Sequence, residues 1–133
     1  MAAPVTCYDI YTAALALLAE PAADRARDCE ERAPYLMAAF CCEAGGIDAV
    51  LREKEGSETQ PTFSAVCIEL DEVFPLSPRF APIAAAYVAA MLVLDENEQL
   101  SDKLYERYCD AMSELCTTLP ADCHAITDVY GFN

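Results

Sequence analysis

The feature that most constrains the fold is an uncharged apolar stretch of 14 residues, 81–94, which is rich in alanine. A helix formed by this stretch is apolar on every side, so the rest of the chain must bury most of its surface. A membrane-spanning helix needs about 20 apolar residues, and this stretch ends at Asp95-Glu96. The sequence therefore predicts the central helix of a folded core rather than a membrane span.

The next segment, residues 97–116, is predicted to form an amphipathic helix capped by Asn97 or Ser101. Its apolar face comprises Leu100, Leu104, Tyr105, Tyr108, Ala111, Met112 and Leu115. Its other side carries five carboxylates at four-residue spacing, which places them on one ridge: Glu98, Asp102, Glu106, Asp110 and Glu114. Like charges at this spacing oppose the helix by about 1–2 kcal/mol over the four pairs. This acidic ridge is a solvated face, a surface that repels DNA, or a surface that meets a basic partner.

Two earlier helices are predicted. The first covers residues 7–19, with Thr6 as its cap and Asp9 completing a capping box. The second begins with a similar box at Asp28 and ends at Gly56. Pro34 either kinks this helix or marks a later start, and the glycine pair 45–46 predicts a bent helix or two short ones.

The segment between the second and third predicted helices, residues 57–77, is predicted to be a long loop. Its apolar side chains would pin it onto the core: Phe63, Val66, Ile68, Leu70 and Phe74. Ser77 and Pro78 suit the start of the following helix. The predicted fold class is thus all-α, a bundle of four to five helices, with a helical domain at 1–119 and an extended C-terminal tail at 120–133.

The tail ends with three apolar side chains close to the terminus: Val129, Tyr130 and Phe132. Chain ends are usually disordered unless they dock. Two aromatic residues among the last four predict docking, either on this domain or on a partner protein.

The charge balance limits the partners. Eight basic and 23 acidic residues give a net charge of −15. Such a charge opposes binding to phosphate backbones and to anionic membranes, and it favours solubility, basic partners or repulsion of nucleic acid. We expect no membrane association.

Eight cysteines invite a disulfide interpretation. The N-terminus, however, lacks the basic and apolar regions of a signal peptide, and several cysteines fall on apolar helical faces. No C-x-x-C pair occurs, and His124 is the single histidine, so zinc-ligand spacing is absent. We favour reduced thiols in a reducing compartment.

The residue pattern also argues against an enzyme. The histidine lies in the tail without a nucleophile pattern, and the four glycines form no phosphate-binding loop. A di-metal carboxylate bundle needs Glu-x-x-His motifs that this chain lacks. We therefore expect no catalytic residues, no metal and no cofactor.

Several short segments occur in an order that resembles a known family. They are 8–20 (YDIYTAALALLAE), 31–36 (ERAPYL), 50–52 (VLR), 70–76 (LDEVFPL), 81–83 (API) leading to 92–96 (LVLDE), and 105–108 (YERY). The chain is similar in this respect to head–tail connector (adaptor, head-completion) proteins of tailed phages and prophages. The resemblance covers about residues 6–116; the high cysteine content and the glycine pair depart from it.

The resemblance implies an all-α subunit of a ring beneath the portal protein. The ring would extend the DNA channel and dock the next head-completion or tail protein. DNA would pass without specific binding, and no catalytic residues are implied. The expected location is the cytoplasm during assembly and then the neck of the virion.

Two alternatives follow from the residues themselves. An acidic DNA mimic that inhibits a DNA-binding enzyme would explain the charge and the ridge, but not the order of segments. A phage assembly chaperone, or a plain helical interaction domain, would explain the helices. Ring formation or portal binding separates the connector from these alternatives.

Overall fold

A computed structural model describes residues 4–18, 26–56 and 65–117. Its helices are α1 (Cys7–Leu17), α2 (Ala26–Lys54), the short 3₁₀ helix η2 (Pro78–Phe80), α3 (Ala81–Val93) and α4 (Glu98–Cys116). No named strand occurs in these ranges; the one isolated β-bridge joins Thr6 and Val73. The predicted all-α bundle is confirmed.

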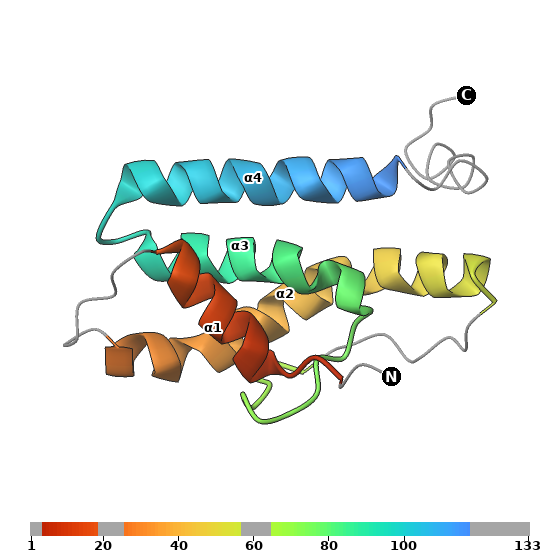
Figure 1. The fold of residues 1–133 in the computed structure, drawn as a ribbon, viewed down its shortest axis with the longest axis horizontal. Coiled ribbons are helices and arrows are strands. Elements are labelled where there is room, and N and C mark those ends of the chain that lie inside the picture. Colours follow the sequence, from red (N-terminus) through yellow and green to blue (C-terminus); the bar gives the residue numbers. More distant parts are fainter. Residues whose placement is uncertain (1–3, 19–25, 57–64, 118–133) are drawn as a thin grey trace.

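The apolar helix α3 lies at the centre of the bundle. It contacts α1, α2 and α4, and every residue from 83 to 90 is buried. Figure 1 shows α4 running alongside α3 and α1 crossing on another side. Small alanines on α3 allow these close approaches, as the sequence predicts.

Helix α1 begins where the sequence predicts. The Thr6 hydroxyl accepts a hydrogen bond from the Asp9 N–H, and the Asp9 carboxylate accepts one from the Thr6 N–H. This reciprocal capping box satisfies backbone donors that have no partner within the helix. The next donors are satisfied by the loop from 65 to 77: the N–H groups of Cys7 and Tyr8 donate to the carbonyls of Glu72 and Leu70.

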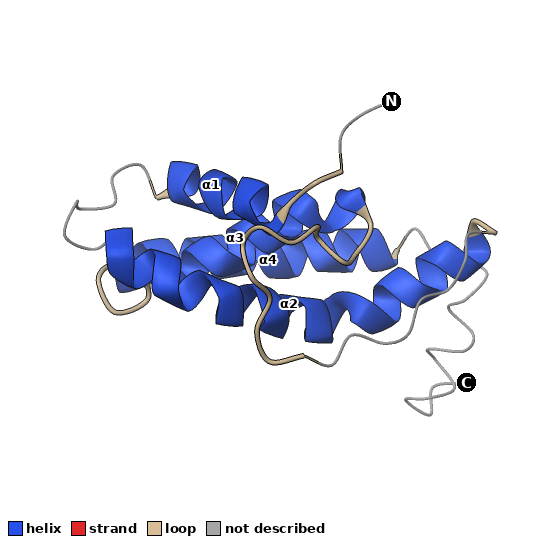
Figure 2. Cartoon of the chain, turned by 90° about the horizontal axis from the view of Figure 1, so that it is seen from below, coloured by secondary structure: helices blue, strands red, loops and turns tan. Residues whose placement is uncertain are grey.

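Helix α2 is one continuous helix of 29 residues with Pro34 inside it. The predicted capping box at Asp28 was wrong: the helix already begins at Ala26, and Asp28 lies in its first turn. Figure 2 shows that its two halves are not collinear, so the bent-helix alternative holds. By length and composition Arg27–Lys54 could cross a membrane, but 44% of its most apolar stretch is buried in this fold.

The long loop follows the prediction in part. Ile68 and Phe74 are buried and pin the loop to the core, whereas Val66 is 78% exposed and does not. Phe63 lies outside the described residues. Ser77 stands at the N-cap position of η2, without a capping hydrogen bond from its side chain, and the α-helix starts only at Ala81.

Gly46 within α2 and Gly56 just after it predict opposite responses to alanine. Gly46 is exposed in the helix, and a Cβ there would meet no neighbouring atom within 4 Å. We expect Gly46→Ala to raise the free energy of unfolding by about 0.5–1 kcal/mol, because glycine loses more backbone entropy on folding. Gly56 follows the helix with φ +77°, so Gly56→Ala should lower it by about 1 kcal/mol. Urea denaturation of both variants tests this pair; equal signs would contradict it.

Candidate functional site

Helix α4 packs on the bundle through one side only. Its buried residues are Ser101, Leu104 and Tyr108, and the Ser101 hydroxyl donates to the buried carbonyl of Ala90 at 2.8 Å. Asn97 caps the helix, with its side-chain oxygen accepting from the Leu100 N–H at 3.1 Å. The sequence assigned Tyr105 to the inner face, which was wrong: its side chain lies at the margin and is 41% exposed.

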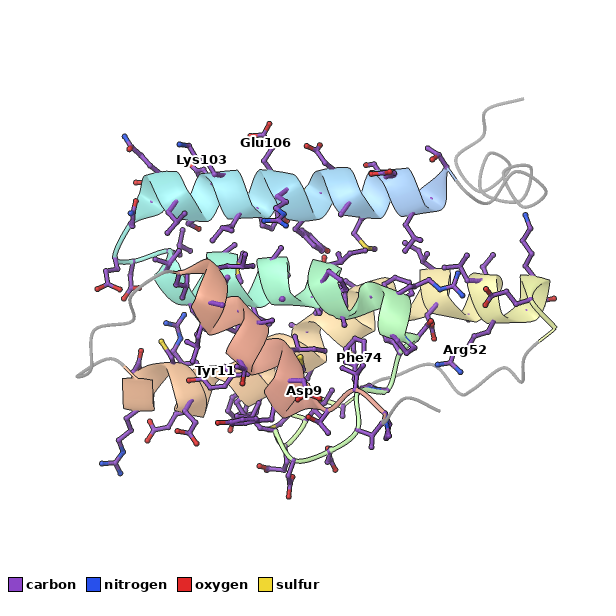
Figure 3. All side chains as sticks on the ribbon, in the orientation of Figure 1. Asp9, Tyr11, Arg52, Phe74, Lys103 and Glu106 are labelled. Atoms are coloured by element: carbon purple, nitrogen blue, oxygen red, sulfur yellow. The ribbon has the colours of Figure 1, made fainter. Side chains whose placement is uncertain are left out.

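The structure places all five ridge carboxylates, Glu98, Asp102, Glu106, Asp110 and Glu114, on the exposed surface of α4. With 3.6 residues per turn, each four-residue step advances a side chain by about 40° and about 6 Å. The ridge therefore winds through about 160° over a length of about 24 Å. Its centre, Glu106, points away from the bundle in Figure 3.

This ridge is an acidic face whose carboxylates form no ion pair within the part of the chain that the structure describes. Lys103 and Arg107 lie on the same helix, yet no ion pair within the described residues joins either of them to a carboxylate. The recorded ion pairs involve Arg27, Arg32 and Arg52 of α2, and Arg79 of η2. The acidic face is accordingly an outward-directed negative surface of α4, with Lys103 beside Glu106 on the outer side (Figure 3).

The buried side of α4 contributes Tyr108 to a cluster of aromatic rings. Phe40 of α2 lies at its centre, with ring centroids 5.9–6.4 Å from those of Phe74, Phe80, Tyr87 and Tyr108. The Tyr108 hydroxyl donates to Glu43 at 3.4 Å. Burial, and then the negative charge of Glu43, raises the pKa of Tyr87 to about 12 and also raises that of Tyr108. Both tyrosines stay protonated as hydrogen-bond donors to Glu43 of α2, Tyr108 from α4 and Tyr87 from α3.

None of these groups forms an arrangement suited to catalysis or to metal binding. In the described part of the chain, no cluster of three or more His, Cys, Asp or Glu side chains could hold a metal ion. A hollow of about 240 Å³ lies between α1 and the start of α3; its lining is apolar except for Asp9 and comprises Val5, Asp9, Ile10, Ala13, Ala81 and Pro82. The Asp9 carboxylate already accepts the capping hydrogen bond of α1. The other lining residues are apolar and carry no side chain that could react.

The cysteines divide by exposure. None of the seven in the described residues is part of a disulfide; Cys7, Cys29 and Cys41 are buried, and Cys42 and Cys109 are exposed. Burial raises the pKa of Cys7 to about 11, assisted by the negative charge of Glu72. Burial likewise raises the pKa of Cys41 to about 12. These thiols behave as small hydrophobic core residues rather than as nucleophiles.

The raised thiol pKa values predict alkaline destabilisation. In the unfolded chain these thiols titrate near 9.0, whereas in the fold Cys7 holds its proton to about 11 and Cys41 to about 12. Between these values the unfolded state binds fewer protons, so the free energy of unfolding should fall as pH rises from 9 toward 11. Urea midpoints at pH 8, 9.5 and 10.5 measure this decline, which should be shallower in Cys41→Ala. A flat profile would contradict the assignment.

The predicted docking residues of the tail, Val129, Tyr130 and Phe132, lie outside the described residues, as does His124. No protein family, characterised protein or solved structure matches this chain. The acidic face of α4 is therefore the candidate site that geometry provides.

Proposed function

We propose that this protein is a structural subunit of a phage or prophage assembly, a head–tail connector that forms a ring beneath the portal. The observation that carries the proposal is the acidic face of α4: five exposed carboxylates over about 24 Å of a rigid helix. Repeated around a ring, such helices would give a channel wall that repels phosphates, so that DNA passes without binding.

The bundle suits such a subunit. Helix α4 contacts the core on one side and leaves its acidic side fully available to line a channel. A ring also needs a head-to-tail interface, in which two different surfaces of the subunit meet. The remaining helices offer such surfaces, and the portal and the following head-completion or tail protein would dock above and below the ring.

The test is the solution mass by light scattering over a concentration series, alone and with the cognate portal, together with negative-stain images. Rings, alone or captured by the portal, are the expected result. A monomer that neither forms rings nor binds the portal would contradict the connector.

Neutralising the ridge tests the role of the acidic face. We expect Asp102→Asn, Glu106→Gln and Asp110→Asn together to leave the ring mass and the helicity unchanged, because these side chains face the channel. DNA release from particles should slow, because the wall repels phosphates less strongly. The matched control is Glu30→Gln, Glu31→Gln and Glu53→Gln, which removes the same charge elsewhere on the exposed surface. Loss of the ring in the ridge variant alone would place a basic neighbour, not the channel, against α4.

The second candidate is an acidic DNA mimic, favoured by the same exposed row of carboxylates. It predicts a monomer that binds a nuclease or repressor tightly, with an affinity that falls steeply with salt. In that case the ridge variant would lose binding, whereas the control variant would keep it.

A further inference from the structure

A second surface, distinct from the acidic face of α4, is built around the segment that precedes η2. Residues 65–74 cross the lower face of the bundle, which is turned toward the viewer in Figure 2. The Cys42 thiol contacts the Ala65 carbonyl at 3.6 Å. Farther along, the Ile68 N–H donates to the Pro34 carbonyl at 3.2 Å, and the Tyr8 N–H donates to the Leu70 carbonyl at 2.8 Å. The segment is therefore held on α2 at one end and on the start of α1 at the other.

The anchored segment and the residues beside its contact points carry four exposed hydrophobic side chains. They are Tyr8, Tyr35, Val66 and Val73, which are 56%, 57%, 78% and 57% exposed; we call them the tyrosine face. Tyr35 follows the Pro34 that accepts from Ile68, and Val73 pairs with Thr6 beside Tyr8. Single exposed hydrophobic residues are ordinary, but a group of them rimmed by polar residues marks an interaction site. Tyrosine is also enriched where partner proteins bind.

The rim of this face is acidic. Glu69, Asp71 and Glu72 are exposed on the same segment, and residues 65–77 contain no Lys or Arg. No ion pair within the described residues involves these three carboxylates. A partner that covers the tyrosine face must therefore bring positive charge to the rim.

We propose that the tyrosine face docks a basic amphipathic segment of a partner protein, with apolar side chains on the tyrosines and Lys or Arg on the rim. A second copy of this chain fits less well, because a two-fold contact would place the patch, and its three carboxylates, against itself. Anionic lipid and nucleic acid are opposed by the same charges. This proposal does not depend on ring formation.

The probe is an 18-residue amphipathic helix of Leu and Lys, titrated calorimetrically into the full-length protein. We expect Tyr8→Ser with Tyr35→Ser to weaken binding about tenfold or more while circular dichroism stays unchanged, since truncating interface anchors typically costs this much. The matched control, Leu94→Ser with Tyr105→Ser, removes exposed hydrophobic side chains elsewhere and should keep wild-type affinity.

The rim has its own test. Glu69→Gln with Asp71→Asn should weaken binding and reduce its salt dependence, whereas Asp102→Asn with Asp110→Asn on α4 should not. Three outcomes would overturn the proposal: equal losses for rim and α4 variants, unchanged affinity in the tyrosine variant, or loss of self-association instead of peptide binding in that variant. Light scattering on the same samples reports ring formation separately, so a failed connector and a failed docking face are distinguishable.

Discussion

Replacing Phe40 with alanine should lower the free energy of unfolding by about 3–5 kcal/mol, the usual cost of removing a buried aromatic ring. Phe40 is fully buried, and its ring touches rings from the loop, η2, α3 and α4. The variant removes the one side chain around which four separate parts of the chain meet. Since small domains are stable by about 5–15 kcal/mol, this loss is a large share of the total. Urea denaturation followed by far-ultraviolet circular dichroism measures it.

Tyr35→Ala is the matched control, because Tyr35 lies on the same helix but is 57% exposed. It should change the free energy of unfolding by no more than about 0.5 kcal/mol. If Phe40→Ala does not fold, Phe40→Leu, with an expected loss of about 1.5 kcal/mol, keeps the test open. Similar losses for Phe40→Ala and Tyr35→Ala would contradict the placement of the aromatic cluster.

The second large effect is expected at Asp48, a buried acidic residue on α2. Its carboxylate accepts from Arg52 at 2.8 Å and from the Ser77 N–H at 3.0 Å. Asp48→Ala would leave that backbone donor without an acceptor and Arg52, whose side chain is 21% exposed, without its counter-charge. We expect a loss of about 2–3 kcal/mol in the free energy of unfolding. Urea denaturation at pH 7 measures it.

Asp48→Asn separates charge from hydrogen bonding, since the amide can still accept from Ser77. It should recover part of the loss. Glu55→Gln is the control: Glu55 pairs with Arg79 nearby, but this pair is exposed and should contribute much less. If Glu55→Gln cost as much as Asp48→Ala, the buried carboxylate would not be the anchor between α2 and η2.

The elements governed by local rules could be predicted from the sequence. The capping box of α1, the buried apolar helix α3 and the cap of α4 depend on neighbouring residues, and all three are present. The exposure of the ridge also follows from helical spacing. The prediction that Tyr105 is buried was wrong because this residue lies at the edge of the apolar face of α4. At such an edge, burial depends on how the neighbouring helix α3 packs against α4.

The features that could not be predicted from the sequence depend on contacts between residues far apart in the chain. Buried Asp48 accepts a hydrogen bond from the Ser77 N–H, 29 positions away. No local sequence pattern predicts that bond. The tyrosine face was missed for the same reason. Val66 looks like a core residue in the sequence, and only the path of residues 65–74 between α1 and α2 leaves it exposed.

The bonds from Cys7 and Tyr8 to Glu72 and Leu70 also have a consequence for synthesis on the ribosome. The start of α1 is synthesised before residues 70–72, so its backbone donors find their acceptors more than 60 residues later. Closing a loop of this length costs entropy that only the packed core recovers. The start of α1 is thus completed only after the chain through Glu72 has been translated.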